Sequence, residues 1–213
     1  PAAVCSRWAE GWKATSEGRR RLRNVAFNFP QGLLGTCLLG MAVVPGGCNE
    51  QLVVMSDTTV HILGRDMSSS GTSFELSTMY TEVAASEEFI YAAGQGQISR
   101  LTHTGTEVAN YNDLDNCIAD PVLGPGGLLF CVLYNGTDNQ DQIVALDAQT
   151  LQPRHRFGLS LLEDARGMVV VGEELFVCNC GNGRLQVFSL AGEHRRSITG
   201  EWKRPRSLCF VKD

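Results

Sequence analysis

One order of segments recurs along this chain: an apolar strand, a turn, a second apolar strand, a turn and a third strand. It is seen in four segments, residues 40–64, 81–108, 118–150 and 165–197. The segment RPRSLCFVKD at 204–213 begins the order a fifth time. A chain built from such copies stacks similar units on one another, so its surface is more important for function than a single enclosed pocket.

The repeats have a nearly constant period. Successive separations of 41, 38, 47 and 39 residues are obtained by taking as equivalent positions Val43, Ala84, Val122, Val169 and Leu208. A period of about forty residues, with four strands per unit, is typical of the blades of a β-propeller. Helical periodicity is essentially absent after residue 20.

The strands within a unit differ in pattern. The second strand is almost entirely apolar, as in LVVM, FIYAA, LLFCVL and LFVC, which predicts burial on both faces between stacked sheets. The third strand alternates apolar and polar residues, as in RLQVFSL. The fourth segment is polar, as in EHRRSI and PRHRF, which suits an outer edge that must resist pairing with other chains.

The predicted fold is therefore all-β: a partial β-propeller of about four four-stranded blades plus the first strand of a fifth, preceded by a short N-terminal α-helix. We expect the helix at residues 1–18, a linker or outer strand at 19–36, and propeller blades at 37–213. Propellers usually have 4 to 8 blades, so we expect that further blades follow Asp213 and that the propeller is truncated here.

The last fifty residues carry a more specific likeness. The segment ARGMVVVGEELFVCNCGNGRLQVFSLAGEHRRSI, followed by KRPRSLCFV, resembles an NHL-type propeller repeat, with its Arg-Gly opening, Gly-Asn turn and Arg-hydrophobic-Gln-Val-Phe strand. The unit at 81–110 keeps the strand pattern and loses the Gly-Asn-x-Arg turn. The resemblance implies a propeller that binds protein partners or RNA.

The N-terminal residues have a separate pattern. PAAVCSRWAEGWKATSEG places Ala3, Val4, Trp8 and Trp12 near one face at helical spacing. It resembles the last helix of an F-box through Val4, Cys5, Arg7 and Trp8. The resemblance implies that Val4, Cys5 and Trp8 contact a Skp-type adaptor; the alternative is a generic amphipathic helix that packs on the propeller.

Composition excludes several classes of protein. Hydrophobic residues make up 43% of the 213 residues, which argues against disorder, and a net charge of -5 disfavours a surface that binds nucleic acid everywhere. No apolar run reaches the roughly 18 residues of a membrane span. The eight cysteines lie mostly among apolar strand residues, which favours reduced thiols and a cytoplasmic or nuclear location.

No catalytic constellation is apparent, so we expect neither an enzyme nor a cofactor or metal ion. A metal-dependent lyase of the amidating-lyase type, which uses a related propeller, would need converging histidines. We expect the four to lie on outer strands, away from the axis: His61, His103, His155 and His194. Asp113, Asp115 and Asp120 are expected to be solvated loop acids rather than a general acid–base pair.

The loops between strands two and three, and those between blades, are the places where a propeller carries binding residues. Trp and Arg often dominate interfaces, and the segment EHRRSITGEWKRPR is basic with an aromatic inside it. The predicted binding residues are Tyr134, Arg166, Asn182, Arg184, Trp202, Lys203, Arg204 and Arg206. An exposed edge strand and turn would explain the same segment without any ligand.

The sequence thus favours a non-catalytic protein-interaction scaffold, with the F-box resemblance implying a substrate-recognition subunit of a ubiquitin ligase. The alternatives are an RNA-binding propeller and, less favoured, the metal-dependent lyase.

Overall fold

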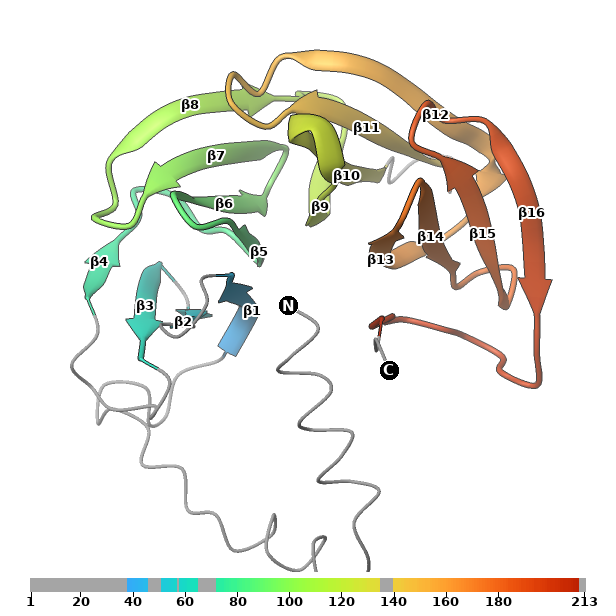
Figure 1. Cartoon of the computed structure of the whole chain (residues 1–213), viewed down its shortest axis with the longest axis horizontal. Coiled ribbons are helices and arrows are strands. Elements are labelled where there is room, and N and C mark those ends of the chain that lie inside the picture. The colour runs from blue at the N-terminus through green and yellow to red at the C-terminus, as the bar shows by residue number, and fades with distance from the viewer. Residues whose placement is uncertain (1–37, 46–50, 57, 65–71, 135–139, 211–213) are drawn as a thin grey trace, which may run out of the picture.

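The computed structural model describes residues 38–45, 51–56, 58–64, 72–134 and 140–210. These residues form four antiparallel sheets of four strands each, arranged along an arc (Figure 1). Within every sheet the strands pair in chain order, so the first strand lies innermost and the fourth outermost. The prediction of an all-β propeller with four blades is confirmed.

Each blade uses about forty residues of the chain. The first blade comprises β1 (Leu38–Val44), β2 (Gln51–Ser56), β3 (Thr59–Leu63) and β4 (Ser73–Glu75). The second comprises β5 (Glu82–Ala85), β6 (Phe89–Gly94), β7 (Gln97–Thr102) and β8 (Glu107–Asn112). The third comprises β9 (Cys117–Leu123), β10 (Leu128–Tyr134), β11 (Asp141–Asp147) and β12 (Pro153–Leu162), with a 3-10 turn at Pro125–Gly127 before β10. The fourth comprises β13 (Ala165–Val171), β14 (Glu174–Asn179), β15 (Arg184–Ser189) and β16 (His194–Thr199).

The apolar second strands are buried because each one faces two neighbouring sheets. On β10, Phe130 and Val132 join the core shared with the fourth blade, whereas Leu129, Cys131 and Leu133 join the core shared with the second blade. All five side chains are fully buried. Successive side chains of a strand point to opposite faces, so a strand between two sheets needs apolar residues at every position.

The outermost strands are polar, as the sequence predicts. On β16 every residue except Ile198 is exposed. The side chain of Arg196 forms an ion pair with Glu174 of β14, and Arg195 pairs with Glu193. Charged side chains on an edge strand disfavour pairing with another chain.

The chain segment that leads into the second blade passes so close to β6 that only glycine fits at the end of that strand. A Cβ atom added to Gly94, the last residue of β6, would lie 2.9 Å from the backbone nitrogen of Thr81 and from the Cα of Tyr80. Real Cβ atoms do not approach backbone atoms this closely. The segment before β5 therefore requires glycine at the end of β6.

Residues 204–210 follow the fourth blade and lie against β13. A Cβ on Gly167 would lie 2.6 Å from the carbonyl oxygen of Arg206 and 2.8 Å from the Cα of Ser207. This is the position expected for the first strand of a fifth blade, yet residues 204–210 pair with no strand in the part of the chain that the structure describes. The predicted N-terminal helix, the linker at 19–36 and the adaptor residues Val4, Cys5 and Trp8 lie outside the described residues.

The close contact at Gly94 leads to the first prediction. Gly94→Ala should lower the free energy of unfolding by about 1–3 kcal/mol, the usual cost of overpacking, because the added methyl group meets backbone atoms that cannot turn aside. Urea denaturation followed by circular dichroism measures the change. An unfolding free energy equal to that of the unaltered protein would show that the contact is not rigid.

Candidate functional site

The loops between second and third strands meet the connections between blades at the same end of each of these sheets. In the second blade, the amide of Asp113 donates to the carbonyl of Gly96 over 2.7 Å. In the fourth blade, a Cβ on Gly183 would lie 2.8 Å from the carbonyl oxygen of Lys203. Both glycines have positive φ, which lets the turn pass this close to the neighbouring backbone. The predicted binding residues are therefore brought to this end of the sheets.

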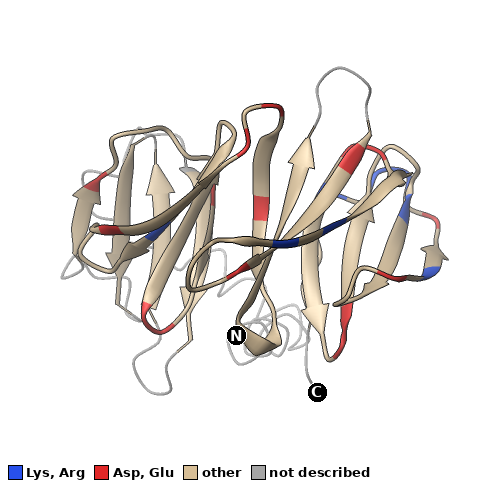
Figure 2. Ribbon diagram, turned by 90° about the horizontal axis from the view of Figure 1, so that it is seen from above, with Lys and Arg blue, Asp and Glu red and all other residues tan. Residues whose placement is uncertain are grey.

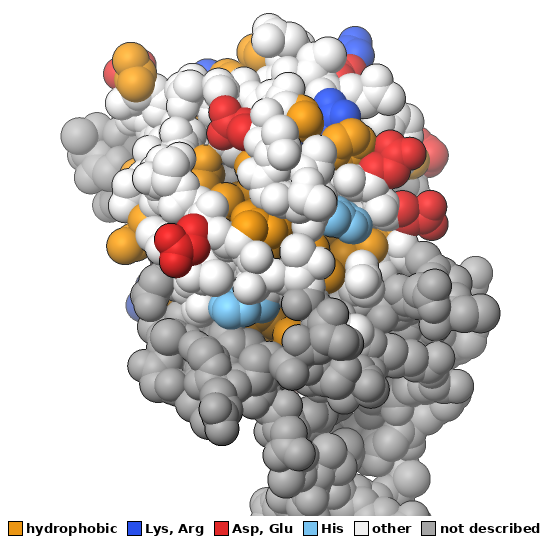
Figure 3. All heavy atoms as spheres, turned by 90° about the vertical axis from the view of Figure 1, so that its left-hand side faces the viewer, with side chains coloured by type: hydrophobic (Ala, Val, Ile, Leu, Met, Phe, Trp, Pro, Cys, Tyr) orange, Lys and Arg blue, Asp and Glu red, His pale blue; other side chains and the backbone are white. Residues whose placement is uncertain are grey.

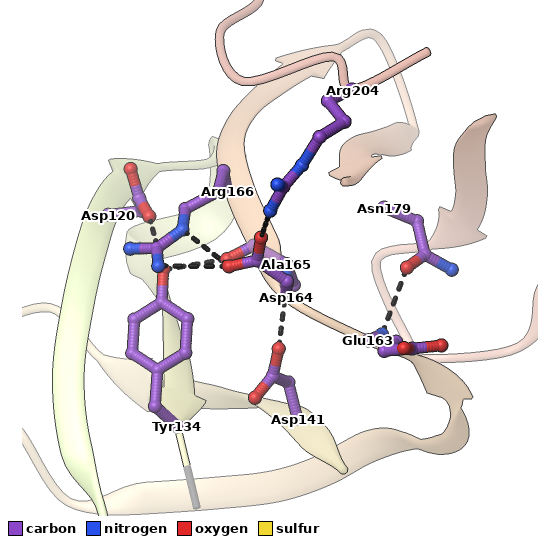
Figure 4. Close-up of polar contacts among 9 residues, drawn as sticks. All are labelled: Asp120, Tyr134, Asp141, Glu163, Asp164, Ala165, Arg166, Asn179 and Arg204. Carbon is purple, nitrogen blue, oxygen red and sulfur yellow. Dashed lines mark hydrogen bonds and ion pairs between the residues drawn. The ribbon is translucent and has the colours of Figure 1, made fainter. Parts of the chain in front are cut away.

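Tyr134 joins the third and fourth blades at this end (Figure 4). Its phenol oxygen lies 2.6 Å from the carbonyl oxygen of Ala165 and 3.1 Å from Oδ2 of Asp120. The amide of Ala165 donates to Oδ2 of Asp141 over 2.6 Å. Both polar backbone groups of Ala165, the first residue of β13, are thus held by side chains of the third blade.

Asp164 forms an acidic centre between two arginines. Nε of Arg166 lies 2.9 Å from Oδ1 of Asp164, and a terminal nitrogen of Arg204 lies 2.8 Å from Oδ2 (Figure 4). Although burial acts in the opposite direction, the hydrogen bonds from Arg204 and Arg166 hold the pKa of Asp164 below its ordinary value. The guanidinium carbon of Arg166 also lies 4.7 Å from the centre of the Tyr134 ring, a cation–π contact.

Three further cations near this centre have no carboxylate partner among the described residues. They are Arg184, Lys203 and Arg206. Lys203 and Arg206 are exposed, and Trp202 beside them exposes 43% of its surface. Asn182, also exposed, donates to Oδ1 of Asn179 over 3.5 Å. This group of five residues, Asn182, Arg184, Trp202, Lys203 and Arg206, is called the basic end patch below.

Basic residues are concentrated in the fourth blade and the segment after it. The described Lys and Arg residues before Arg166 are Arg100, Arg154 and Arg156. Figure 2 shows acidic segments spread over all the sheets, while most basic segments lie toward the fourth blade. The side of the molecule seen in Figure 3 carries acidic side chains scattered around apolar ones. The basic end patch is thus a local exception on a chain with a net charge of -5.

The structure divides the predicted binding residues into two groups. The exposed group comprises Arg166, Asn182, Trp202, Lys203, Arg204 and Arg206, with Arg184 partly buried beside it. Tyr134 differs: its ring lies under Arg166 and its hydroxyl bonds within the protein, so it orders the site rather than presenting a free contact. A sequence pattern places Tyr134 at a loop but cannot show that the next blade covers its ring.

The solvated state expected for the loop acids is wrong for Asp113 and Asp120. Asp113 is only 7% exposed and pairs with Arg156 of β12 over 2.8 Å. Asp120 lies in β9 rather than in a loop, at a bulge where its φ is 49°. Asp tolerates this left-handed conformation better than most residues, and the bulge turns its side chain toward Tyr134.

The inner strands also bring together charged groups that sequence reasoning missed. Glu82 of β5, Asp120 of β9 and Arg166 of β13 lie near enough to influence one another's ionisation. Burial, reinforced by the charge of Asp120 and opposed by Arg166, raises the pKa of Glu82 to about 7. Burial also raises the pKa of Asp120. Each residue comes from a different blade, so no local pattern reveals the cluster.

The Tyr134 hydroxyl has two acceptors within reach, the carbonyl oxygen of Ala165 and Oδ2 of Asp120. A phenol has one proton to donate, so it serves one of these acceptors at a time, and the shorter contact is the one to Ala165. Burial raises the pKa of Asp120, although the contact with Tyr134 acts in the opposite direction.

The histidines do not converge. They lie on four different blades, on β3 (His61), after β7 (His103), on β12 (His155) and on β16 (His194). Among the described residues, no group of three or more His, Cys, Asp or Glu side chains is placed to hold a metal ion. The described cysteines are all free: Cys117, Cys131, Cys178, Cys180 and Cys209. No helix in the described part of the chain is long and apolar enough to cross a membrane.

Neither a protein-family model nor a curated protein sequence matches this chain. Solved structures do match its fold. The structure of U3-55K aligns with a TM-score of 0.65 at 9% identity, over 81% of this chain and 54% of that one. Apo AztD from Citrobacter koseri aligns at 0.55 and 11% identity, over 79% and 49%, and Hsv2 from Kluyvelomyces marxianus at 0.52 and 13%, over 72% and 50%. The chain spans about half the length of these structures, and the likeness shows the fold alone.

The half-buried carboxyl groups of Glu82 and Asp120 lead to a prediction about pH. A carboxyl group whose pKa is raised on folding contributes its full stability below the unfolded pKa, and this contribution is lost as pH rises through the folded value. The unfolding free energy should therefore fall between about pH 5 and about pH 8, the range in which a carboxyl with a raised pKa ionises. Asp120→Asn should make this fall smaller, because the amide does not ionise and the loss of the Asp120 charge also lowers the pKa of Glu82. Urea denaturation across this range measures both.

Asp120→Ala is the matched control. It removes the same charge but also the acceptor for the Tyr134 hydroxyl, and alanine is poorly suited to a φ of 49°. It should be less stable than Asp120→Asn by about 1 kcal/mol or more. An Asp120→Asn protein with the pH dependence of the unaltered chain would show that Asp120 is ionised throughout.

Proposed function

We propose that this chain is a non-catalytic protein-interaction scaffold that binds an acidic segment of a partner protein at the basic end patch. The observation that carries the proposal is the gathering of Arg184, Lys203 and Arg206, which lack carboxylate partners among the described residues, beside the exposed ring of Trp202. Most other described basic side chains already have such a partner.

The rigid sheets support this function because they hold the patch in place. The carbonyl of Lys203 lies against the turn at Gly183, and Arg204 is tied to Asp164, so the connection between blades is ordered before a partner arrives. A pre-ordered surface loses less conformational entropy on binding. Trp and Arg are also the side chains that most often dominate the energy of interfaces.

An acidic protein segment suits the patch better than RNA does. A nucleic-acid strand needs a continuous track of cations for successive phosphates. Here Asp164 lies among the cations and Glu163 lies beside Gly181 at the same end, so a long phosphate backbone would meet carboxylates. A short acidic segment can engage the unpaired cations and place an apolar side chain on Trp202.

A more specific proposal concerns the complex in which this scaffold acts. The resemblance of residues 165–213 to NHL-type repeats, and of Val4, Cys5 and Trp8 to the end of an F-box, supports a substrate-recognition subunit of a ubiquitin ligase in the cytoplasm or nucleus. The N-terminal residues would contact a Skp-type adaptor, and the basic end patch would hold the substrate. The scaffold would act by raising the local concentration of substrate near the ligase, with no catalytic residue or cofactor of its own.

The patch is tested with a fluorescent ten-residue peptide rich in Glu that contains one Leu. The double variant Lys203→Glu, Arg206→Glu should bind it at least about tenfold more weakly than the unaltered chain, a loss of about 1.4 kcal/mol. The change reverses two of the three unpaired charges of the patch. Fluorescence anisotropy at physiological salt measures the affinity. Arg195→Glu, which alters an exposed cation of β16 already paired with Glu193, is the control and should bind normally.

The same titration with a ten-nucleotide single-stranded RNA separates the alternatives. RNA that binds more tightly than the peptide, with an affinity that falls steeply as salt is added, would contradict the proposal and favour the RNA-binding propeller. Equal peptide binding by the double variant and the control would also contradict it.

The ligase proposal is tested by a pulldown with a Skp-type adaptor. The intact chain should retain the adaptor, and the double variant Val4→Ala, Trp8→Ala should lose it, because it removes the two largest apolar contacts of the F-box-like helix. Lys203→Glu, Arg206→Glu should retain the adaptor, since these residues lie at the other proposed surface. Failure of the intact chain to bind would reject the ligase proposal and leave the acidic-segment proposal standing.

A further inference from the structure

The turn between the second and third blades holds a leucine almost completely in water. Leu114 is 98% exposed. Its neighbours are ordered, because Oδ1 of Asp113 accepts hydrogen bonds from the amide of Asp115 over 3.3 Å and from the side chain of Asn116 over 2.9 Å. The turn therefore presents Leu114 to solvent in a fixed position rather than folding it back onto the sheets.

A bulge in β12 exposes two more leucines at the same end of the third blade. Residues 158–161 of β12 occupy a stretch in which β11 has the single residue Gln142. Ser160 has a φ of 65°, a conformation uncommon for residues other than glycine. Leu159 is 54% exposed, and Leu161 is exposed as well. Bulges redirect side chains out of the regular pattern of a strand, and this one directs leucines into water.

An ion pair joins the turn to the strand that carries the bulge. A terminal nitrogen of Arg156 on β12 lies 2.8 Å from Oδ2 of Asp113, the residue before Leu114. The hydroxyl of Tyr111 accepts a hydrogen bond from the same arginine over 2.8 Å. Asp113 is buried, so packing fixes this contact. The three exposed leucines thus lie on elements that are held together, and they are called the leucine surface below: Leu114, Leu159 and Leu161.

Two exposed carboxylates flank the leucine surface. Asp115 follows the turn leucine, and Glu163 follows the bulge. Neither forms an ion pair with any residue that the structure describes. The cations nearest to Glu163 along the chain, Arg156 and Arg166, already have carboxylate partners. The leucine surface is therefore apolar with an acidic border, opposite in charge to the basic end patch.

We propose that the leucine surface binds a basic amphipathic segment of a partner protein. The apolar side chains of the segment cover the three leucines and remove them from water. Its Lys or Arg side chains pair with Asp115 and Glu163, which orients the segment and speeds its association. An anionic membrane suits this surface poorly, because its charge would meet the same two carboxylates. The surface shares no residue with the basic end patch.

The probe is a fluorescent ten-residue peptide of Lys and Leu, with leucines three or four residues apart so that they share one face of a helix. It should bind the 213-residue chain saturably in fluorescence anisotropy at physiological salt. The variant Lys203→Glu, Arg206→Glu should bind this peptide at least as tightly as the unaltered chain, although it loses the acidic peptide. The two proposals therefore fail independently.

Leu114→Ser tests the apolar contact. Because Leu114 is so exposed, the substitution should leave folding unchanged, and it should weaken binding of the Lys and Leu peptide at least about tenfold. Val108→Ser is the matched control, since it alters an exposed apolar residue of β8 that lies outside the leucine surface. This control should bind within about threefold of the unaltered chain. Circular dichroism checks that both variants keep their strands.

A pair of charge-reversed variants tests the acidic border. Asp115→Lys, Glu163→Lys should weaken peptide binding at least about tenfold. Glu87→Lys, Glu173→Lys changes the net charge equally on exposed hairpins at the opposite end of the sheets, and it should bind within about threefold of the unaltered chain. The comparison separates pairing at the leucine surface from general attraction of a cationic peptide to a chain with a net charge of -5.

Four outcomes would overturn the proposal. Leu114→Ser and Val108→Ser could bind the peptide equally, or the two charge-reversed variants could do so. Tighter binding to phosphatidylserine vesicles than to the peptide would assign the surface to a membrane. A dimer of the unaltered chain in sedimentation that Leu114→Ser dissociates would assign it to a second copy of this chain.

Discussion

The burial of each second strand between two neighbouring sheets is the constraint on which the rest of this structure depends. Phe130 and Val132 pack on the fourth blade while Leu129 and Leu133 pack on the second, so a single strand contributes to two cores. No blade can bury both of its faces alone. Stability is therefore shared between neighbours, and the position of every loop follows from how the sheets stack.

Polar contacts also hold the third blade against the fourth. Ala165 is held through its amide by Asp141 and through its carbonyl by Tyr134, and both side chains belong to the preceding blade. Buried polar groups are costly unless each has a partner, so these contacts specify one arrangement of the two sheets. The same arrangement places Arg166 over the Tyr134 ring and brings Arg204 to Asp164, which orders the charged side chains at this end of the sheets.

The basic end patch results from this construction. It consists mostly of side chains on loops that the sheets hold still, and the proposed partner is a segment that carries carboxylates. Binding of this kind weakens as salt is added.

The sequence by itself determined the blades, because strand burial imposes a local pattern: a run such as LLFCVL between glycine-rich turns must be covered on both faces, and a polar segment such as EHRRSI must lie outside. It also placed Lys203 and Arg206 on the connection after the fourth blade, whereas Arg166, which was expected on a connection, is the second residue of β13. Only the tertiary structure decided that Tyr134 is covered, that Asp113 is buried and Asp120 half-buried, and that Glu82 has a raised pKa. These properties arise between residues that are about forty positions apart on different blades, and no local pattern encodes the dielectric environment or the hydrogen-bond partners that such distant residues provide.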